Sequence, residues 1–268
     1  MNGFLIELEP VLFRLGPFTV RWFGLLLLTA LASGLWLTVR LATDLGLPTR
    51  VVLDLASWAL PLGFLGARLF HVAEHAEYYL GRPAEIIDLG SGGLSIWGGL
   101  ALGGITVWLL CRRRGLKTAY LADASAAGLA LSEAIGRLAC FTNGDGQGRP
   151  SDLPWATRYS SNDALTPDYG VPRHPAQVYQ GLADLAIFGL FWLSRDARLV
   201  SGIRFWLWLG LYGASRLLVG LVRLDPPFLF GLQQGQLIGL AAVAVAAFAI
   251  IRTLTMESGG GRSSEPRR

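Results

Sequence analysis

Seven long apolar stretches constrain the fold of this chain more than any other feature. A membrane-spanning helix needs about 20 consecutive, mostly apolar residues. Stretches near that length recur at 18–39, 51–73, 92–110, 119–139, 175–194, 202–221 and 235–252. Only 16% of the 268 residues are charged, whereas a soluble domain has about 25%. We therefore predict an all-α polytopic membrane protein with seven transmembrane helices.

The positions of Lys and Arg predict the orientation of these helices. Thirteen of the 23 follow the first, third, fifth and seventh stretches or lie at their ends, and six lie on the opposite side. Cytoplasmic loops carry the excess of Lys and Arg, so the N-terminus is expected outside and the C-terminus in the cytoplasm. The net charge of +4 does not indicate nucleic-acid binding, because the basic residues lie between the predicted spans.

The sequence predicts one membrane domain over residues 1–256, with its longest loop at 140–174. That loop is rich in proline and is expected to form a small extracytoplasmic cap, with one short strand near 155–159. Residues 257–268 are rich in Gly, Ser and Arg, which predicts a disordered cytoplasmic tail. Residues 1–17 lack a basic start followed by an apolar run, so no cleavable signal peptide is expected.

Four arginines lie inside the predicted spans, all in the outer half of the membrane: Arg21, Arg68, Arg137 and Arg216. A charge in lipid is costly and marks a functional site by default. Guanidinium groups bind phosphate oxygens in a bidentate manner, so we favour a shared site for a phospholipid head group. The alternative is structural pairing with internal acids, for which the candidates are Asp54, Asp123, Glu133 and Asp184. Arg137 is followed by a polar, glycine-rich loop that contains Asn143 and Asp145 and suits an anionic head group.

Histidines and a cysteine offer further chemistry. His174 opens the fifth span and can act as a base, although a lone interfacial histidine is more often a cap. His71 and His75 share a helical face, but no third ligand is apparent, and we predict neither a metal nor a cofactor. Cys140 is a candidate nucleophile, with a small packing residue as the favoured interpretation. Tyr212 lies four residues before Arg216, on the same helical face.

Several ordered motifs resemble the bacterial prolipoprotein diacylglyceryl transferases over most of the chain. They are Arg21-Trp22-Phe23-Gly24, Gly66-Ala67-Arg68, the 92–99 segment, Arg112-Arg113-Arg114-Gly115-Leu116, Gly136-Arg137 through Asn143-Gly144, Gly148-Arg149-Pro150, Asp152-Leu153-Pro154-Trp155, His174-Pro175-x-Gln177-x-Tyr179, Leu211-Tyr212-Gly213 with Arg216, and Gly235-Gln236.

The resemblance implies an activity. Members of that family transfer the diacylglyceryl group of phosphatidylglycerol to the lipobox cysteine thiol of a preprolipoprotein and release glycerol phosphate. The enzyme is then a multi-pass protein of the bacterial inner membrane, active as a monomer, with its site facing the outer leaflet. The catalytic residues implied are Arg137, Arg216, His174 and Tyr212. The implied substrate-binding residues are Arg137, Asn143, Asp145, Arg68, Arg21, Trp97, Gly98, Gly99, Gln177 and Tyr179.

The chain also departs from the family pattern. Trp97 stands where the family usually has His, Cys140 where it has Asn, and Asp145 where it has Glu. Gln180 and Gly220 both replace Glu. Either another group such as His174, or water, deprotonates the thiol, or the protein is a divergent paralogue with another acceptor or donor. A non-catalytic phospholipid-binding membrane protein is a further alternative.

Overall fold

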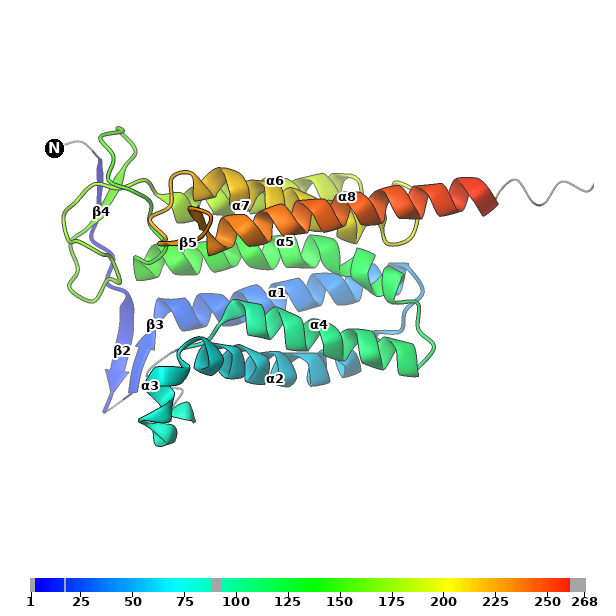
Figure 1. Ribbon diagram of the computed structural model, residues 1–268, viewed down its shortest axis with the longest axis horizontal. Helices are drawn as coiled ribbons and strands as arrows, with labels where there is room; N and C mark the ends of the chain where they lie inside the picture. The colour runs from blue at the N-terminus through cyan, green and yellow to red at the C-terminus, as the bar shows by residue number, and fades with distance from the viewer. Residues whose placement is uncertain (1–2, 17, 88–92, 261–268) are drawn as a thin grey trace, which may run out of the picture. The chain divides into compact units, whose positions relative to one another are not determined.

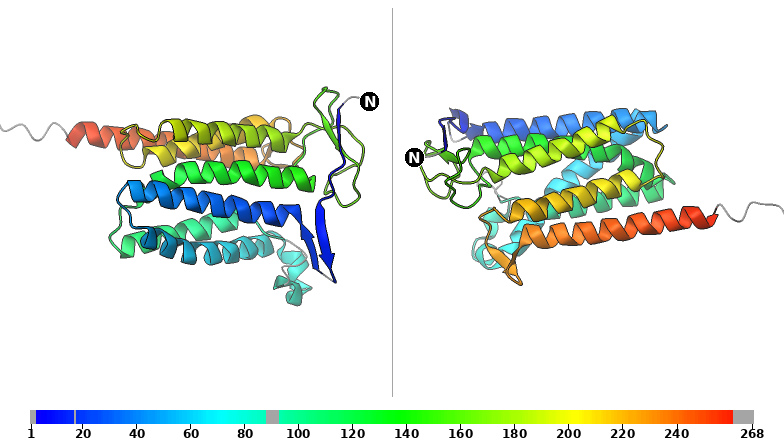
Figure 2. Two further views of the ribbon diagram at one scale, coloured as in Figure 1. Left: turned by 180° about the vertical axis from the view of Figure 1, so that it is seen from behind. Right: turned by 90° about the horizontal axis from the view of Figure 1, so that it is seen from above.

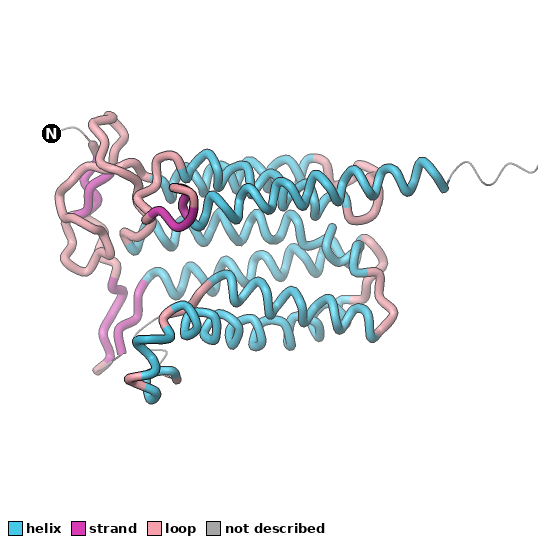
Figure 3. The backbone as a smooth tube through the Cα atoms, in the orientation of Figure 1, coloured by secondary structure: helices cyan, strands magenta, loops and turns pink. Residues whose placement is uncertain are grey.

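The computed structural model describes residues 3–16, 18–87 and 93–260, and most of them are helical (Figures 1 and 3). The α-helices in this part of the chain are α1 (Trp22–Asp44), α2 (Thr49–Glu74), α3 (Ala76–Leu80), α4 (Ile96–Arg113), α5 (Thr118–Asn143), α6 (Ala176–Leu193), α7 (Ile203–Gly220) and α8 (Gln234–Gly260). A 3-10 helix, η1, covers Pro83–Ile86. The strands are β1 (Phe4–Ile6), β2 (Val11–Leu15), β3 (Phe18–Arg21), β4 (Thr157–Tyr159), β5 (Pro227–Leu229) and β6 (Leu232–Gln233).

Each of the seven predicted stretches contains one long helix. Among the described residues, four helices are long and apolar enough to cross a membrane: α1, α2, α5 and the Gln234–Ser258 part of α8. The other three, α4, α6 and α7, have 18 residues each, which gives about 27 Å at 1.5 Å per residue. The structure therefore supports an apolar helical membrane protein, and the count of seven spans stays a prediction.

Three predicted boundaries need correction. The first span was expected from residue 18, but 18–21 form β3 and the helix begins at Trp22. The third was expected from residue 92, which lies outside the described residues, and α4 begins at Ile96. The disordered tail was expected from residue 257, but α8 continues to Gly260. Residues 261–268 of that predicted tail lie outside the described residues.

The chain divides into two compact units, Met1–Thr38 with Ala122–Arg268, and Val39–Leu121. In the first unit, α5, α6, α7 and α8 run side by side (Figure 2). Small residues let α5 approach its neighbours closely: Ser132 Oγ donates to the Ala30 carbonyl of α1 over 2.8 Å. Asp123 of α5 caps the start of α7, since its carboxylate accepts hydrogen bonds from the backbone N–H groups of Gly202 (2.5 Å) and Phe205 (3.0 Å). The core of α5 is made of alanines: Ala124, Ala126, Ala127, Ala130 and Ala139.

The 144–175 loop is ordered by short backbone pairings at one end of these helices (Figure 1). β4 pairs in parallel with β1, and Thr157 exchanges two 2.9 Å backbone hydrogen bonds with Arg173. A second bridge joins Gly148 to Arg223, just after α7. The expected strand near 155–159 is confirmed as β4. Its location outside the membrane stays a prediction, as does the single domain over 1–256.

In the second unit, α2 packs against α4 through glycines. A Cβ built on Gly98 would lie 2.1 Å from the Gly66 carbonyl oxygen, so neither position tolerates a side chain. Pro61 lies within α2, which continues through it. Near the other end of α2, Asp54 forms an ion pair with Arg114.

Candidate active site

Arg137 lies near the C-terminal end of α5, against α6. Its Nη2 lies 3.3 Å from Glu133 Oε2, one turn earlier on the same helix. A Cβ built on Gly181 would be 3.1 Å from the Arg137 Cβ, so the glycine lets α6 approach the arginine stem. Arg137 also interacts electrostatically with Tyr212, Cys140 and Asp184. Of the internal acids considered as structural partners of the arginines, Glu133 does pair with Arg137, through one contact of 3.3 Å.

Arg216 of α7 has two buried guanidinium donors without a partner in the described chain. Its Nε and Nη1 atoms are buried and have no hydrogen-bond partner among the described residues. Gly235 makes room for the group, since a Cβ there would lie 2.6 Å from Arg216 Nη2. Arg216 interacts electrostatically with Tyr212, Arg137 and Arg223. Buried donors without partners are rare in folded proteins and call for a missing acceptor.

A buried polar network joins α6 to α7 beside these arginines. Gln180 Nε2 donates to Asp184 Oδ1 (3.0 Å) and to Ser215 Oγ (2.8 Å). Both Gln180 and Asp184 are buried. A glutamate at position 180, as the family pattern has it, could not donate to Asp184 while ionised. The glutamine therefore fits this network, and Asp184 Oδ2 stays without a partner in the described chain.

Arg21, Asn143 and Asp145 meet where α5 ends. Arg21 Nε donates to Asn143 Oδ1 over 2.8 Å, and its Nη2 donates to the Asp163 carbonyl over 2.5 Å. The Asp145 carboxyl hydrogen-bonds to the Asn143 side chain and interacts with Arg137 and Arg223. Burial raises the pKa of Asp145 above its ordinary value despite these cations. The structure thus brings together three residues that the sequence predicted for one site.

His174 and Tyr179 form a second cluster at the start of α6. His174 Nδ1 lies 3.3 Å from the Tyr179 hydroxyl, which accepts a 2.8 Å hydrogen bond from Trp155 Nε1. Gln177 is fully buried and donates to the Tyr159 hydroxyl over 3.3 Å. Burial raises the pKa of Tyr159 to about 12, so this phenol stays protonated. The contact between Gln177 and Tyr159 joins α6 to the loop that contains β4, and a role of Gln177 in substrate binding stays a prediction.

Arg68 and the 97–99 residues belong to the second unit. Arg68 donates to three backbone carbonyls, those of Ile86 (2.8 Å), Gly93 (2.8 Å) and Glu85 (2.6 Å). Its guanidinium therefore fixes the connection between α2 and α4. Gly98 and Gly99 lie on the α2-facing side of α4, and Trp97 is partly exposed in its first turn.

Three of the residues considered for metal binding or nucleophilic chemistry are His71 and His75 in the second unit and Cys140 in the first. In the described chain, no group of three His, Cys, Asp or Glu side chains could hold a metal ion. The His71 and His75 rings lie 4.3 Å apart. Cys140 is a free, half-buried thiol that interacts with Arg137 and Asp145.

The first unit therefore contains a cationic centre made of Arg137, Arg216 and Arg223. Sequence reasoning missed Arg223, which lies three residues beyond the end of α7 at Gly220 and pairs there with Gly148. Arg223 is held by Asp225 through 2.7 and 3.0 Å hydrogen bonds. Arg216 leaves two buried donors unpaired among the described residues, beside Arg137 and Arg223. Such an arrangement can accept an anion with several oxygen atoms.

Comparison with known proteins identifies the family. The profile of the prolipoprotein diacylglyceryl transferase family matches residues 10–252. The chain belongs to this family. It is 31% identical over 237 residues to the phosphatidylglycerol–prolipoprotein diacylglyceryl transferase of Finegoldia magna, covering 88% of this chain and 92% of the relative. The protein of that name from Dehalococcoides mccartyi is 32% identical, with 91% and 93% coverage. The one from Frankia casuarinae is 35% identical, with 79% and 53% coverage.

The family match includes every residue of the cationic centre. Arg137, Arg216, Arg223 and Tyr212 all fall within 10–252. Gly220, where a Glu was expected, faces Gln236: a Cβ on Gly220 would lie 2.5 Å from Gln236 Cγ. The Gln236 side chain thus fills the space beside Gly220, the position at which the family pattern has Glu. Nothing in the sequence pattern alone connected the two positions.

Proposed function

We propose that this protein transfers the diacylglyceryl group of phosphatidylglycerol to the lipobox cysteine of a preprolipoprotein. The observation that carries the proposal is the pair of buried Arg216 donors, Nε and Nη1, that have no partner among the described residues and lie beside Arg137 and Tyr212. A phosphodiester supplies the oxygen acceptors that these donors lack. The relatives that match most of the chain carry the name of this transferase.

The reaction requires charge stabilisation on the leaving group. The acceptor thiolate attacks the glyceryl carbon bonded to the phosphate oxygen. A C–S bond forms, the C–O bond breaks, and its electron pair leaves with glycerol phosphate. Arg216 and Arg137 would bind the phosphate oxygens and stabilise the charge that develops as this bond breaks. Tyr212, which interacts with both arginines, would fix their orientation. Asn143, Asp145 and Arg21 would contact the glycerol head group of the lipid.

The thiol proton must also be removed. His174 is the candidate base, and its Nδ1 contact with Tyr179 would hold the ring in place. The resemblance assigned Trp97, Gly98 and Gly99 to substrate binding; within the second unit, Gly98 and Gly99 pack α4 against α2. We assign Arg68 and Gln177 to positions that hold the loops of their own units. The proposed enzyme acts as a monomer with seven spans in the bacterial inner membrane, and its site faces the outer leaflet.

Turnover in proteoliposomes tests the function. The substrates are phosphatidylglycerol and a peptide with the lipobox Leu-Ala-Gly-Cys, and the product is detected by its gain of one diacylglyceryl mass. We expect Arg137→Gln and Arg216→Gln to lower kcat at least about 100-fold, the scale for losing one donor to a developing oxyanion. Arg216→Lys keeps the charge but loses the fork, so we expect an intermediate loss.

The matched control is Arg204→Gln in the same helix as Arg216. Arg204 donates to the carbonyls of Arg195 and Ala197, away from the residues assigned to the site, so its loss should leave turnover within a few-fold of native. If the native protein binds phosphatidylglycerol but makes no product, the transferase proposal is wrong and a lipid-binding role takes its place. Turnover that survives Arg216→Gln would remove Arg216 from the site.

A further inference from the structure

Strand β1 has an open edge. In the parallel pairing of β1 with β4, Phe4 and Ile6 face β4: Phe4 N donates to the Ala156 carbonyl over 2.7 Å, and Ser160 N donates to the Ile6 carbonyl over 3.3 Å. Backbone groups of successive strand residues point to opposite sides. The N–H and C=O of Leu5 therefore point away from β4, and neither has a hydrogen-bond partner among the described residues.

The opposite side of this small sheet is closed. Thr157 of β4 exchanges hydrogen bonds with Arg173, and the Tyr159 carbonyl accepts one from Gly170 N over 3.1 Å. The two-stranded sheet therefore has one edge left to pair, and it belongs to β1. An unpaired strand edge is the site where an extended peptide adds as a further strand.

An apolar concavity of about 510 Å³ adjoins the same strand. All three β1 residues line it, together with Trp155, Val178, Tyr179 and Leu182 among others. We name this feature the β1 concavity. It has the size of a ligand pocket, and it is lined almost entirely by apolar side chains.

Two residues that line the β1 concavity lie next to residues of the candidate active site. Phe141 lines it and lies four residues after Arg137 on α5, about 6 Å along the helix axis. Tyr179 lines it as well, and the same hydroxyl contacts His174 Nδ1. A chain lying along β1 therefore ends close to groups that the transferase reaction uses.

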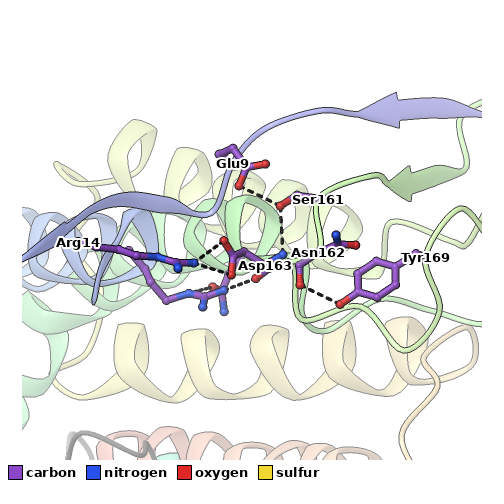
Figure 4. A network of polar contacts seen from close by, with 8 residues as sticks. Glu9, Arg14, Ser161, Asn162, Asp163 and Tyr169 are labelled. Carbon is purple, nitrogen blue, oxygen red and sulfur yellow. Dashed lines mark hydrogen bonds and ion pairs between the residues drawn. The ribbon is translucent and has the colours of Figure 1, made fainter. Parts of the chain in front are cut away.

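The segment after β1 is fastened to the loop after β4. Arg14 donates to both carboxylate oxygens of Asp163 at 3.0 and 2.8 Å, and Ser161 Oγ donates to Glu9 over 3.0 Å (Figure 4). Figure 4 also shows Tyr169 reaching the Asn162 carbonyl, at 3.0 Å. These contacts hold β1 in place, so that its edge is preformed for a partner strand.

We propose that the edge of β1 and the β1 concavity bind the apolar residues that precede the cysteine of the acceptor peptide, as an added strand. This inference rests on the transferase function proposed above. A peptide strand satisfies both free groups of Leu5, and its alternate side chains enter the concavity. An acyl chain would bury the same surface but would leave the N–H and C=O of Leu5 unpaired, which costs free energy in an apolar environment.

Proline at position 5 tests the edge directly. Leu5→Pro removes the outward N–H, while the hydrogen bonds to β4 come from Phe4 and Ile6, and proline is tolerated on such an edge. We expect the KM for the lipobox peptide to rise about fivefold, the scale of one lost main-chain hydrogen bond. The kcat and the KM for phosphatidylglycerol should stay within twofold of native. The matched control, Leu5→Val, also shortens the side chain in the concavity but keeps the N–H, so its KM for the peptide should be clearly lower than that of Leu5→Pro.

A scan of N-methylated peptides gives a second readout that does not depend on how the variant folds. Methylating one backbone nitrogen at a time should weaken binding at every second residue, because only alternate residues of a strand face β1. Binding is followed by the fluorescence of a labelled peptide in detergent. The measurement therefore still tests docking if the native protein shows no turnover, and failure of the proposed function is separable from failure of this site.

Three outcomes would overturn the proposal. One is an equal KM for peptide in Leu5→Pro and Leu5→Val, and another is an N-methyl scan without a two-residue period. The third comes from Val178→Phe, which narrows the β1 concavity. A rise in the KM for phosphatidylglycerol alone would assign the concavity to an acyl chain instead of the peptide.

Discussion

An arginine that binds a ligand differs from one that holds its own chain by the donors left free on its guanidinium. Arg68 gives its donors to three loop carbonyls, and its removal would loosen the connection after α2. Arg216 leaves Nε and Nη1 buried and unpaired in the described chain. Both arginines lie in apolar stretches of the sequence. Their proposed roles differ because the fold places backbone carbonyls around Arg68 and leaves two donors of Arg216 without an acceptor in the described chain.

Asp145 provides a prediction at the same scale, on pH and stability. Its pKa is raised above the ordinary value of 3.8 by burial, so the folded state favours the protonated carboxyl. The stability that this group contributes is fully present below its unfolded pKa and is lost as the pH rises through the folded pKa. We expect Asp145→Asn to unfold at a higher temperature than the native protein at pH 8, and the difference to shrink toward pH 4.

Thermal unfolding in detergent at the two pH values measures this effect. Asp196→Asn is the control, because that carboxylate is exposed and its replacement should shift the midpoint little at either pH. An Asp145→Asn variant that is less stable than native at pH 8 would mean that the cations Arg137 and Arg223 outweigh the burial of the carboxyl.

At the scale of elements, the length of the apolar stretches predicted where the helices lie, but it did not predict which strands pair. All seven predicted stretches contain a helix, because about 20 apolar residues favour one wherever they lie. Of the six strands in the described chain, only β4 was predicted. Strand β1 has only three residues, and its partner lies more than 150 positions away. The sequence predicted a site at Arg137 and Arg216, and that site stays a prediction. The Gln180–Asp184–Ser215 network could not be predicted, because it depends on how α6 packs against α7.

Close packing of α1 against α5 gives an element-scale prediction. A Cβ at Gly34 would lie 1.8 Å from Ser132 Oγ and 2.8 Å from the Gly128 carbonyl oxygen. Gly34→Ala would therefore force the helices apart and break the Ser132–Ala30 hydrogen bond. We expect a loss of about 1–3 kcal/mol, the usual cost of overpacking, seen as a lower unfolding midpoint in detergent.

Gly24→Ala is the matched control in the same helix. Apart from its chain neighbours and its own helix backbone, no described residue has an atom within 4 Å of a Cβ built there, so the change should be neutral or slightly stabilising through helix propensity. Equal midpoints for the two variants would show that α1 and α5 do not pack this closely in the membrane.

At the scale of the whole molecule, the charge asymmetry between loops bears on which ends of the helices face the cytoplasm. Thirteen Lys and Arg residues fall on one predicted side and six on the other. Positively charged loops are retained in the cytoplasm. The arginines after α4 would then face the cytoplasm, and the 144–175 loop, with β4 and the β1 edge, would face outside. That arrangement places the proposed peptide-binding edge on the side from which a secreted acceptor is presented.

Cysteine labelling in oriented membrane vesicles decides between the two orientations. Asn162 lies in the 144–175 loop and Arg113 at the end of α4, and both are exposed. We expect a membrane-impermeant maleimide to label Asn162→Cys in right-side-out vesicles and Arg113→Cys only in inside-out vesicles. The native protein sets the background, because Cys111 is buried and Cys140 is half-buried. The reverse labelling pattern would put the proposed acceptor site in the cytoplasm, where no secreted lipobox is available after export, and would contradict both the orientation and the peptide edge.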